Sequence, residues 1–298
     1  MQMRDDLGIT IKLENGKAYL EFLLPEDVGR LQSALQIEIW EEAEGERLVF
    51  HGEYSSEEAD SMTALLLRPH LWYGMRDPYV YLVKAQGRFG IVEYGEEMGG
   101  MEKEEESDPA EDIPEAVEVY WRQELAIYDV RVVDKKGISL NEKEFQPREV
   151  VYRFPPQISD AGTWEEQMRR DLDRLARMGV NAIRLERTGS GAEGQDHCEM
   201  RAFYRLCRRG GFLTGDLWIR PENLPVYRGL PGETTCQALL AADGRTLTER
   251  YYYYQAKWSS EPVLYPAIST LHRQENGLVS LIIYSNQKKV VLYVDGVL

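Results

Sequence analysis

Residues 163–185 read TWEEQMRRDLDRLARMGVNAIRL and carry the signals of a helix followed by a buried strand. Thr163 and Glu166 form a capping box, in which a hydroxyl and a carboxylate bind amide groups that the first helical turn leaves unpaired. Gly179 can adopt the left-handed conformation that ends a helix, and residues 180–185 are an apolar run typical of a strand buried on both sides. Between them, apolar residues recur at steps of three and four along one face: Trp164, Met168, Leu172, Leu175 and Met178. The stretch predicts the second half of a βαβ unit.

Size and charge limit the classes of protein to consider. The chain has 298 residues, enough for two or three domains that each bury a core. Its formal net charge of -16 argues against a nucleic-acid partner, because binding to phosphate backbones needs clustered Lys and Arg. No apolar run reaches the roughly 18 to 20 residues of a membrane span, and the start of the chain lacks the hydrophobic core of a signal peptide. We expect no membrane partner and a cytoplasmic location, unless an N-terminal leader precedes this sequence.

The cysteines and histidines do not indicate a disulfide framework or a metal centre. Cys198, Cys207 and Cys236 are odd in number and lack a CxxC spacing. His197 beside Cys198 is a possible metal-ligand pair, but no further ligand lies nearby in the sequence, and an ordinary helix start is the favoured interpretation. We expect neither a metal nor a cofactor.

The N-terminal part of the chain has the pattern of short β-strands. Residues 9–13 and 18–22 alternate apolar and polar on either side of Asn15-Gly16, a hairpin signal. Further strands are expected at residues 35–41, 47–54, 64–67, 79–86, 117–121 and 125–133. This pattern favours an antiparallel β-sandwich over residues 1–136. Within it, residues 95–116 are rich in acids, Gly and Pro, and are expected to form a solvated loop, with docking of a basic partner as the alternative.

The rest of the chain predicts a multidomain α+β protein. Residues 137–262 are expected to hold about three parallel strands, because helices alternate with strands in the order βαβαβ. After Arg220 this order stops, and residues 263–298 are expected to begin a partial C-terminal β-sandwich. The expected parallel strands are 148–154, 180–185 and 212–219, with helices at 163–178 and 199–208. They are followed by a loop at 221–231, helices at 235–242 and 248–258, and strands at 267–271, 278–284 and 289–294.

Several stretches, in order, carry a resemblance to a known family. Residues 69–81, PHLWYGMRDPYVY, are similar to the end of the immunoglobulin-like sandwich in family 2 glycoside hydrolases, the β-galactosidase and β-glucuronidase group. Residues 137–143 followed by Arg148 resemble that family's Asn-Gly-Lys turn and first barrel strand. Residues 171–184 resemble its first barrel helix and second strand, and 251–262 with 281–296 its last barrel helix and following sandwich. The resemblance implies an immunoglobulin-like sandwich, a reduced (β/α) barrel-like core and part of a second sandwich.

The sequence departs from the family pattern where the family carries out catalysis. Family members place an acid/base Glu, in an Asn-Glu pair, after the fourth barrel strand and a nucleophilic Glu after the seventh. A (β/α)₈ barrel needs roughly 200 residues or more, whereas about 110 separate Gln146 from Ser259. The Asn141-Glu142 pair precedes the barrel region and therefore does not match. In the family a Ser-His-Tyr-Pro turn follows the arginine that corresponds to Arg184, and this turn is also absent. The resemblance is to a shortened and degenerate member.

The chemistry of a glycosidase sets the remaining expectations. Retaining hydrolysis uses two carboxylates about 5 to 5.5 Å apart whose environments separate their pKa values. The weak catalytic candidates are Glu186 and Asp216, at the carboxyl ends of neighbouring parallel strands. Pairing of either with Arg184 or Arg187 would be the purely structural interpretation. We therefore predict a carbohydrate-related binding or assembly module without the standard catalytic pair, whose carbohydrate contacts are Arg184, Trp218, Tyr227 and Trp258.

Two alternatives stay open at this point. One is an active glycosidase, which uses Glu186 and Asp216 or a barrel half supplied by a partner chain. The other is a gene fragment with no function of its own. A three-stranded parallel sheet also has two open edges that invite pairing with other chains. We expect residues 221–258 or another subunit, as in a homo-oligomer, to cover these edges.

Overall fold

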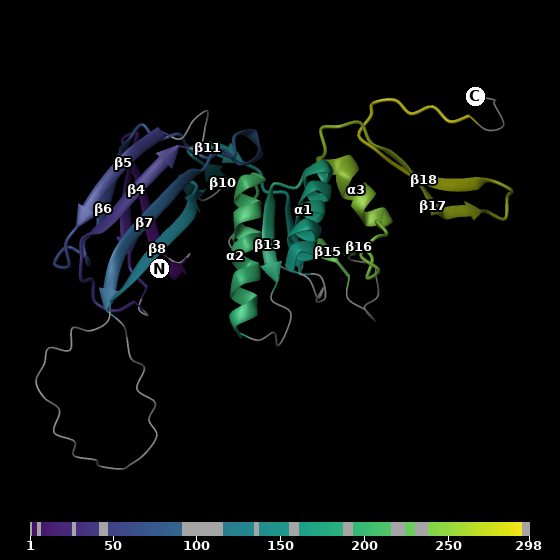
Figure 1. Ribbon diagram of the computed structural model, residues 1–298. Helices are drawn as coiled ribbons and strands as arrows, with labels where there is room; N and C mark the ends of the chain where they lie inside the picture. Colours follow the sequence, from purple (N-terminus) through teal and green to yellow (C-terminus); the bar gives the residue numbers. More distant parts are fainter. Residues whose placement is uncertain are drawn as a thin grey trace, which may run out of the picture. The chain divides into compact units, whose positions relative to one another are not determined.

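The computed structural model describes residues 2–4, 7–25, 28–41, 47–90, 116–133, 137–154, 161–186, 193–215, 224–229 and 238–293. The chain divides into two compact units, Met1–Trp72 with Tyr79–Asp129, and Tyr73–Pro78 with Val130–Leu298 (Figure 1). The boundaries expected at residues 136 and 262 stay predictions. The expected acidic loop lies outside the described residues, apart from residue 116.

The first unit contains two sheets of short strands. The five-stranded sheet has the order β1-β8-β7-β4-β5, in which the strands are Gln2–Arg4, Ala116–Leu125, Tyr81–Gly90, Leu35–Glu41 and Arg47–Tyr54. The three-stranded sheet has the order β2-β3-β6, with strands Gly8–Glu14, Lys17–Leu23 and Thr63–Leu67. Only β1 and β8 pair in parallel among these strands. Asn15 and Gly16, both at positive φ, turn β2 into β3 as the hairpin signal predicts.

The core of the first unit is apolar. On β3, Ala18, Leu20 and Phe22 are buried while the residues between them are exposed, so the predicted alternation is confirmed. Ile37 and Ile39 of β4 are fully buried in the same cluster. Among the described residues of this unit, no charged or amide side chain is buried.

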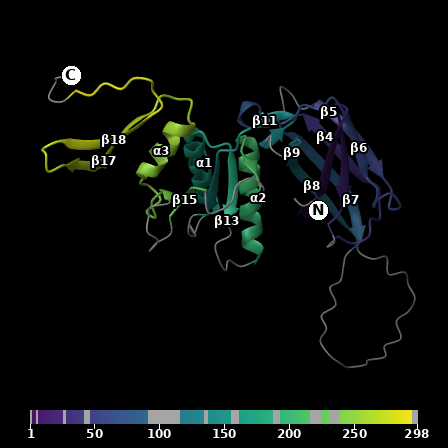
Figure 2. The same cartoon turned by 180° about the vertical axis from the view of Figure 1, so that it is seen from behind.

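A parallel five-stranded sheet forms the centre of the second unit. Its order is β14-β13-β12-β15-β16, and every neighbouring pair is parallel. The strands are Leu213–Thr214, Ala182–Glu186, Glu149–Arg153, Val226–Arg228 and Ala238–Leu240. Helix α1 lies between α2 and α3 (Figures 1 and 2). All three helices contribute to one apolar cluster with the strands, so they cover the same face of the sheet. Their bounds are Ala161–Met178, Glu193–Arg209 and Glu249–Trp258.

The sheet corrects the expectation of about three parallel strands. Strands β15 and β16 add two more beside β12. Each has three residues, too few to produce a recognisable strand pattern, and β16 lies where a helix at 235–242 was expected. Numbered along the chain, the strand order is 3-2-1-4-5, because the chain passes from β14 to the far side of β12. The barrel-like core of the sequence prediction is therefore an open sheet in the described residues, with β14 and β16 at its edges.

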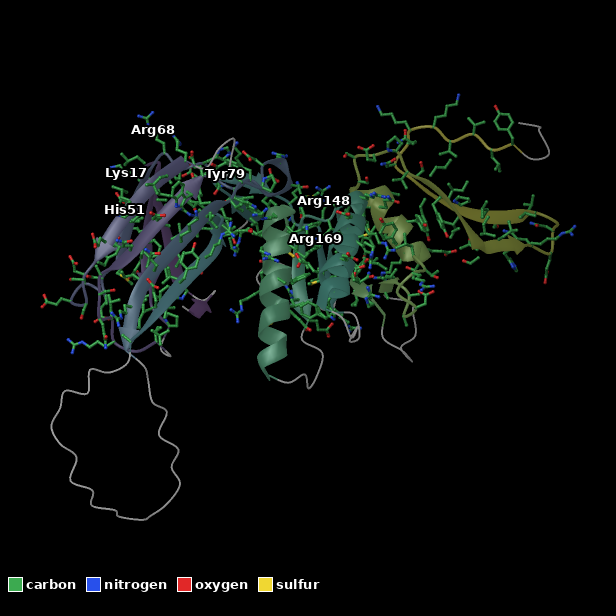
Figure 3. The ribbon with its side chains drawn as sticks, in the orientation of Figure 1. Lys17, His51, Arg68, Tyr79, Arg148 and Arg169 are labelled. Carbon is green, nitrogen blue, oxygen red and sulfur yellow. The ribbon has the colours of Figure 1, made fainter. Side chains whose placement is uncertain are left out.

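Helix α1 ends where the sequence predicts, and its end is fixed by several contacts. It begins at Ala161, two residues before Thr163, so Thr163 lies within the helix and not at the predicted capping position. It ends at Met178, and Gly179 has a φ of +90°, the left-handed value that the C-terminal signal requires. A Cβ at Gly179 would lie 2.4 Å from the carbonyl oxygen of Trp258, so the ends of α1 and α3 meet only because this residue is a glycine. Arg148, labelled in Figure 3, donates through Nη1 to the same oxygen at 2.5 Å.

Smaller elements complete the second unit. Strands β9, β10 and β11 form an antiparallel sheet, and β17 and β18 form a hairpin. Tyr265 of β17 stacks on Tyr252 of α3 with ring centroids 3.8 Å apart. The strand expected at 289–294 is not formed by its described residues, 289–293. The bounds are Val130–Val133, Gly137–Leu140, Lys143–Phe145, Leu264–Arg273 and Val279–Ser285, with a short 3-10 helix, η1, at Gly74–Arg76.

None of the described helices combines the length and the apolar character needed to cross a membrane.

Candidate functional site

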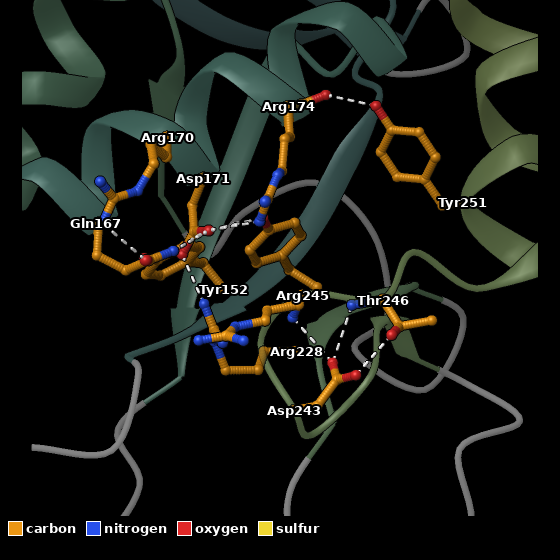
Figure 4. A network of polar contacts seen from close by, with 11 residues as sticks. Tyr152, Gln167, Arg170, Asp171, Arg174, Arg228, Asp243, Arg245, Thr246 and Tyr251 are labelled. Atoms are coloured by element: carbon orange, nitrogen blue, oxygen red, sulfur yellow. Dashed lines mark hydrogen bonds and ion pairs between the residues drawn. The ribbon is translucent and has the colours of Figure 1, made fainter.

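Asp171 of α1 is the centre of a buried network of polar side chains (Figure 4). Its carboxylate is fully buried. One oxygen, Oδ1, accepts hydrogen bonds from the Tyr227 hydroxyl and the Gln167 Nε2, both at 2.8 Å. The other, Oδ2, accepts from the Tyr152 hydroxyl at 3.1 Å and from Arg228 Nη2 at 2.8 Å. These contacts join α1 to β12 and β15, and they supply the partners that a buried charge requires.

The two tyrosines of this network are held as hydrogen-bond donors. Burial raises the pKa of Tyr152 well above its usual value, and the negative charge of Asp171 raises it further. Burial and the same carboxylate also raise the pKa of Tyr227. Both phenols therefore keep their protons at neutral pH. Arg174, whose Nη1 lies 3.6 Å from Asp171 Oδ1, adds a second positive charge on the helix side of the network.

Arg153 and Arg228 end two neighbouring parallel strands. Val151 of β12 pairs with Val226 of β15, so two residues further along each strand these arginines stand at the same level. The chain goes from β12 to β13 on one side and reaches β15 on the other, which makes this the point where the strand order reverses. In open parallel sheets, ligands bind outside the carboxyl ends of the strands at such a point. The candidate site is therefore at the carboxyl ends of β12, β13 and β15.

Glu186, the described member of the candidate catalytic pair, is paired with an arginine. Arg153 stands directly opposite it in the ladder between β12 and β13. Its Nε donates to Glu186 Oε2 at 2.6 Å, and its Nη2 lies 3.5 Å from Oε1. An arginine partner was one of the two interpretations of the sequence, with Arg184 or Arg187 as the partner. The partner found is Arg153; Arg184 pairs with Glu149, and Arg187 lies outside the described residues. The exposed fraction of the Glu186 side chain is 42%, against 12% for Arg153.

Arg184 and Tyr227, two of the predicted carbohydrate contacts, lie in the interior. Arg184 donates through Nε to Glu149 Oε1 at 3.0 Å, and both side chains are buried between β12 and β13. The Tyr227 ring is fully buried and stacks on Tyr152, with ring centroids 5.6 Å apart. Neither residue offers an exposed surface to a sugar, so the structure does not favour these two assignments.

The other predicted site residues are placed differently. Trp258 ends α3 with its ring partly buried against Tyr254, at a centroid distance of 4.5 Å. Asp216 and Trp218 lie outside the described residues, as do the side chains of His197 and Cys198. No group of three or more His, Cys, Asp or Glu that could hold a metal ion occurs in the described part of the chain.

Sequence reasoning missed Asp171, although a signal for it was present. Met168, Asp171, Leu175 and Met178 follow one another at steps of three, four and three, so the acid lies on the apolar face of α1. A single carboxylate on such a face must find donors in the core. Its partners could not be named from sequence, because β15 is too short to be recognised.

Comparison with known proteins gives structural neighbours but no sequence relatives. No family model matches the chain, and no curated protein matches it. A β-D-glucuronidase from Dictyoglomus thermophilum is 16% identical with a TM-score of 0.46, covering 75% of this chain and 32% of its own. A β-glucuronidase from Ruminococcus gnavus is 17% identical with a TM-score of 0.46, covering 72% and 28%. A β-glycosidase from Bacteroides vulgatus is 16% identical with a TM-score of 0.46, covering 71% and 23%.

These neighbours are β-glucuronidases and a β-glycosidase. The two β-glucuronidases carry one of the enzyme names in the group that the sequence resembles. The chain spans between about a quarter and a third of their length. At such identities and TM-scores the likeness assigns no activity to the chain.

Proposed function

We propose that the chain is a noncatalytic, carbohydrate-related module that resembles family 2 glycoside hydrolases. The observation that carries the proposal is the pairing of Glu186 with Arg153. A general acid in glycoside hydrolysis must hold a proton for the leaving oxygen, and a nucleophile must be free to approach the anomeric carbon. A carboxylate that accepts hydrogen bonds from a guanidinium across the strand ladder is suited to neither role.

The other carboxylates of the sheet are also unsuited to catalysis. Asp171 is fully buried and accepts hydrogen bonds from four side chains, so a substrate cannot approach its oxygens. Glu149 is buried against Arg184. The described ends of the strands thus support a role in binding or assembly rather than in turnover.

An active glycosidase is the second candidate, and one observation favours it. Glu186 ends a parallel strand with 42% of its side chain exposed, so its outer surface can meet a ligand. In that case Asp216, or a partner chain, would supply the second carboxylate.

Turnover of aryl glycosides separates the two candidates. The purified chain is incubated with a panel of aryl β-glycosides that includes a glucuronide and a galactoside, beside Glu186→Gln and Asp216→Asn variants. We expect release of the aryl group at the rate of a blank without protein. Glu166→Gln, which changes an exposed acid of α1, serves as the control. The noncatalytic proposal would be refuted if the wild type and this control release the aryl group while Glu186→Gln or Asp216→Asn does not.

Carbohydrate binding is tested separately on a glycan array. We expect binding without turnover, weakened by Trp258→Ala and Trp218→Ala. Tyr19→Ala, which changes an aromatic residue that is 41% exposed on β3, serves as the control and should leave binding unchanged. Absence of any glycan signal would leave assembly as the module's role. Light scattering behind size exclusion then tests assembly, and a clean monomer would rule out the homo-oligomer.

A further inference from the structure

Arg228 has a buried donor group that the described residues do not satisfy. Only 5% of its side chain is exposed. Its Nη2 donates to Asp171, whereas its Nε is buried without a hydrogen-bond partner. Nearly all buried polar groups in folded proteins have a partner, and those of a charged group are the most costly to leave unpaired. This nitrogen therefore requires an explanation.

The described acids beside Arg228 also accept hydrogen bonds or ion pairs from other donors. Two guanidinium groups, those of Arg174 and Arg228, share the one carboxylate of Asp171. Asp243 is the acid drawn beside this group in Figure 4, and its oxygens accept hydrogen bonds from the backbone N–H groups of Arg245 and Thr246 and from the Thr246 hydroxyl. Neither carboxylate supplies an acceptor for the Nε of Arg228, which stays buried without one.

The backbone around Arg228 is shaped to leave space for the guanidinium. Gly244 has a φ of +68°, and a Cβ there would lie 2.6 Å from Arg228 Nη1. Arg153 ends the neighbouring strand at the same level. Two arginine-bearing strand ends therefore meet where the strand order reverses, the usual place for a ligand in an open parallel sheet.

We infer that the carboxyl ends of β12 and β15 bind a small oxyanion, a phosphate or carboxylate group, through the Nε of Arg228. The anion supplies the missing acceptor, and Arg153 adds attraction from the adjacent strand. Guanidinium groups favour such anions because the spacing of their N–H donors matches the oxygens of a planar carboxylate or a tetrahedral phosphate. The enclosed position selects a small anionic group over an uncharged polymer. This inference goes beyond the proposed function and does not depend on sugar binding.

Thermal unfolding of the full chain tests the inference. Melting temperatures are measured against rising inorganic phosphate, acetate or chloride at matched ionic strength. We expect a saturable rise with phosphate or acetate that chloride does not produce, because a ligand bound by the native state stabilises it. Arg228→Gln should abolish this rise. Arg169→Gln, which removes an exposed arginine of α1 that Figure 3 labels, should retain it. An equal response to chloride, or an unchanged rise in Arg228→Gln, would overturn the inference.

A second variant covers the case in which Arg228→Gln does not fold. Arg228→Lys keeps the charge but loses the Nε donor, so we expect at least a tenfold weaker affinity for phosphate. Affinity is measured directly by phosphorus NMR of inorganic phosphate, with acetate and sulfate as competitors to identify the preferred anion. Wild-type protein that leaves the phosphate signal unchanged and shows no acetate-dependent rise in melting temperature would overturn the inference. The same affinity in Arg228→Lys would exclude Arg228 as the contact.

Discussion

The two units bury different kinds of side chain. The core of the first unit is apolar in all its described residues, whereas every described polar or charged residue that is buried lies in the second unit: Asn141, Glu149, Asp171, Arg184 and Arg228. Apolar cores accept many sequences of suitable pattern and volume. A buried charge accepts only the arrangement that supplies its partners. Pattern is therefore sufficient for the first unit, while the parallel sheet of the second depends on particular pairs.

The hydrogen bonds to Asp171 reinforce the sheet between β12 and β15, the pair of neighbouring strands with the shortest backbone ladder. β12 and β13 are in register over five residue pairs, but β12 and β15 share a single pair, Val151 with Val226. Tyr227 and Arg228 of β15 are fixed instead to Asp171 of α1. Side-chain contacts therefore reinforce the junction between β12 and β15, where the backbone ladder of this sheet is shortest.

The largest expected effect follows from removing this carboxylate. Asp171→Ala should destabilise the second unit by about 3–5 kcal/mol, because it leaves the Arg228 charge buried without its partner. Urea unfolding measures the loss, and hydrogen exchange at the amides of β15 locates it. Asp173→Ala, two residues further along α1 on its exposed side, should cost less than about 0.5 kcal/mol. Equal losses in the two variants would contradict the role of the network.

Alkaline pH should also distinguish the units. Burial raises the pKa of Tyr251 in the second unit, and that of Tyr81 in the first, to about 12. Below pH ~10 both folded and unfolded chains keep these protons, so stability does not change. Above it the unfolded chain releases them first, and stability falls by up to about 1.4 kcal/mol per pH unit for each such tyrosine.

The second unit should respond more steeply, because Tyr152 and Tyr227 have raised pKa values as well. Circular dichroism together with tyrosinate absorbance follows the loss. Tyr251→Phe should reduce the steepness, whereas Tyr19→Phe on the exposed side of β3 should not. A first unit that unfolds at the lower pH would reverse the expected order.

A smaller effect is expected in the apolar core of the first unit. Ile37→Val removes one buried methylene group and should cost about 0.5–1.5 kcal/mol at any pH, because no titrating group is involved. Urea unfolding at neutral and alkaline pH measures it. A cost that changes with pH would indicate that this core is coupled to buried charge.

The smallest effect is expected at the exposed ion pair of the sheet. Glu186→Gln should change stability by about 0–1 kcal/mol, since 42% of the Glu186 side chain is in solvent. Glu149→Gln changes the buried ion pair with Arg184, which joins the same two strands, β12 and β13. It should lower the free energy of unfolding several times more than Glu186→Gln does. Chemical denaturation of both variants gives the comparison, and a larger loss at Glu186 would indicate that Arg153 needs this partner for more than surface pairing.

The sequence predicted the elements whose patterns extend over several turns or strand residues. Helix α1 and the strands of the first unit other than β1 follow from apolar spacing and from the Asn15-Gly16 turn. Strands β15 and β16 did not follow, because three residues carry too little pattern and Pro225 precedes β15 as a loop signal. The pairing of Glu186 with Arg153 was also out of reach, since it depends on the register between β12 and β13. Asp171 was within reach as the one acid on the apolar face of α1.

The strand order also has a consequence for synthesis on the ribosome. A nascent chain that has emerged as far as Thr214 contains β12, β13 and β14, but one backbone edge of β12 must wait for residues 226–228. Until they arrive, Asp171 lacks both Tyr227 and Arg228. The growing polypeptide thus exposes an unpaired strand edge beside an acid that has only two of its four hydrogen-bond donors, Tyr152 and Gln167. During this interval the chain is most open to aggregation and to binding by a chaperone.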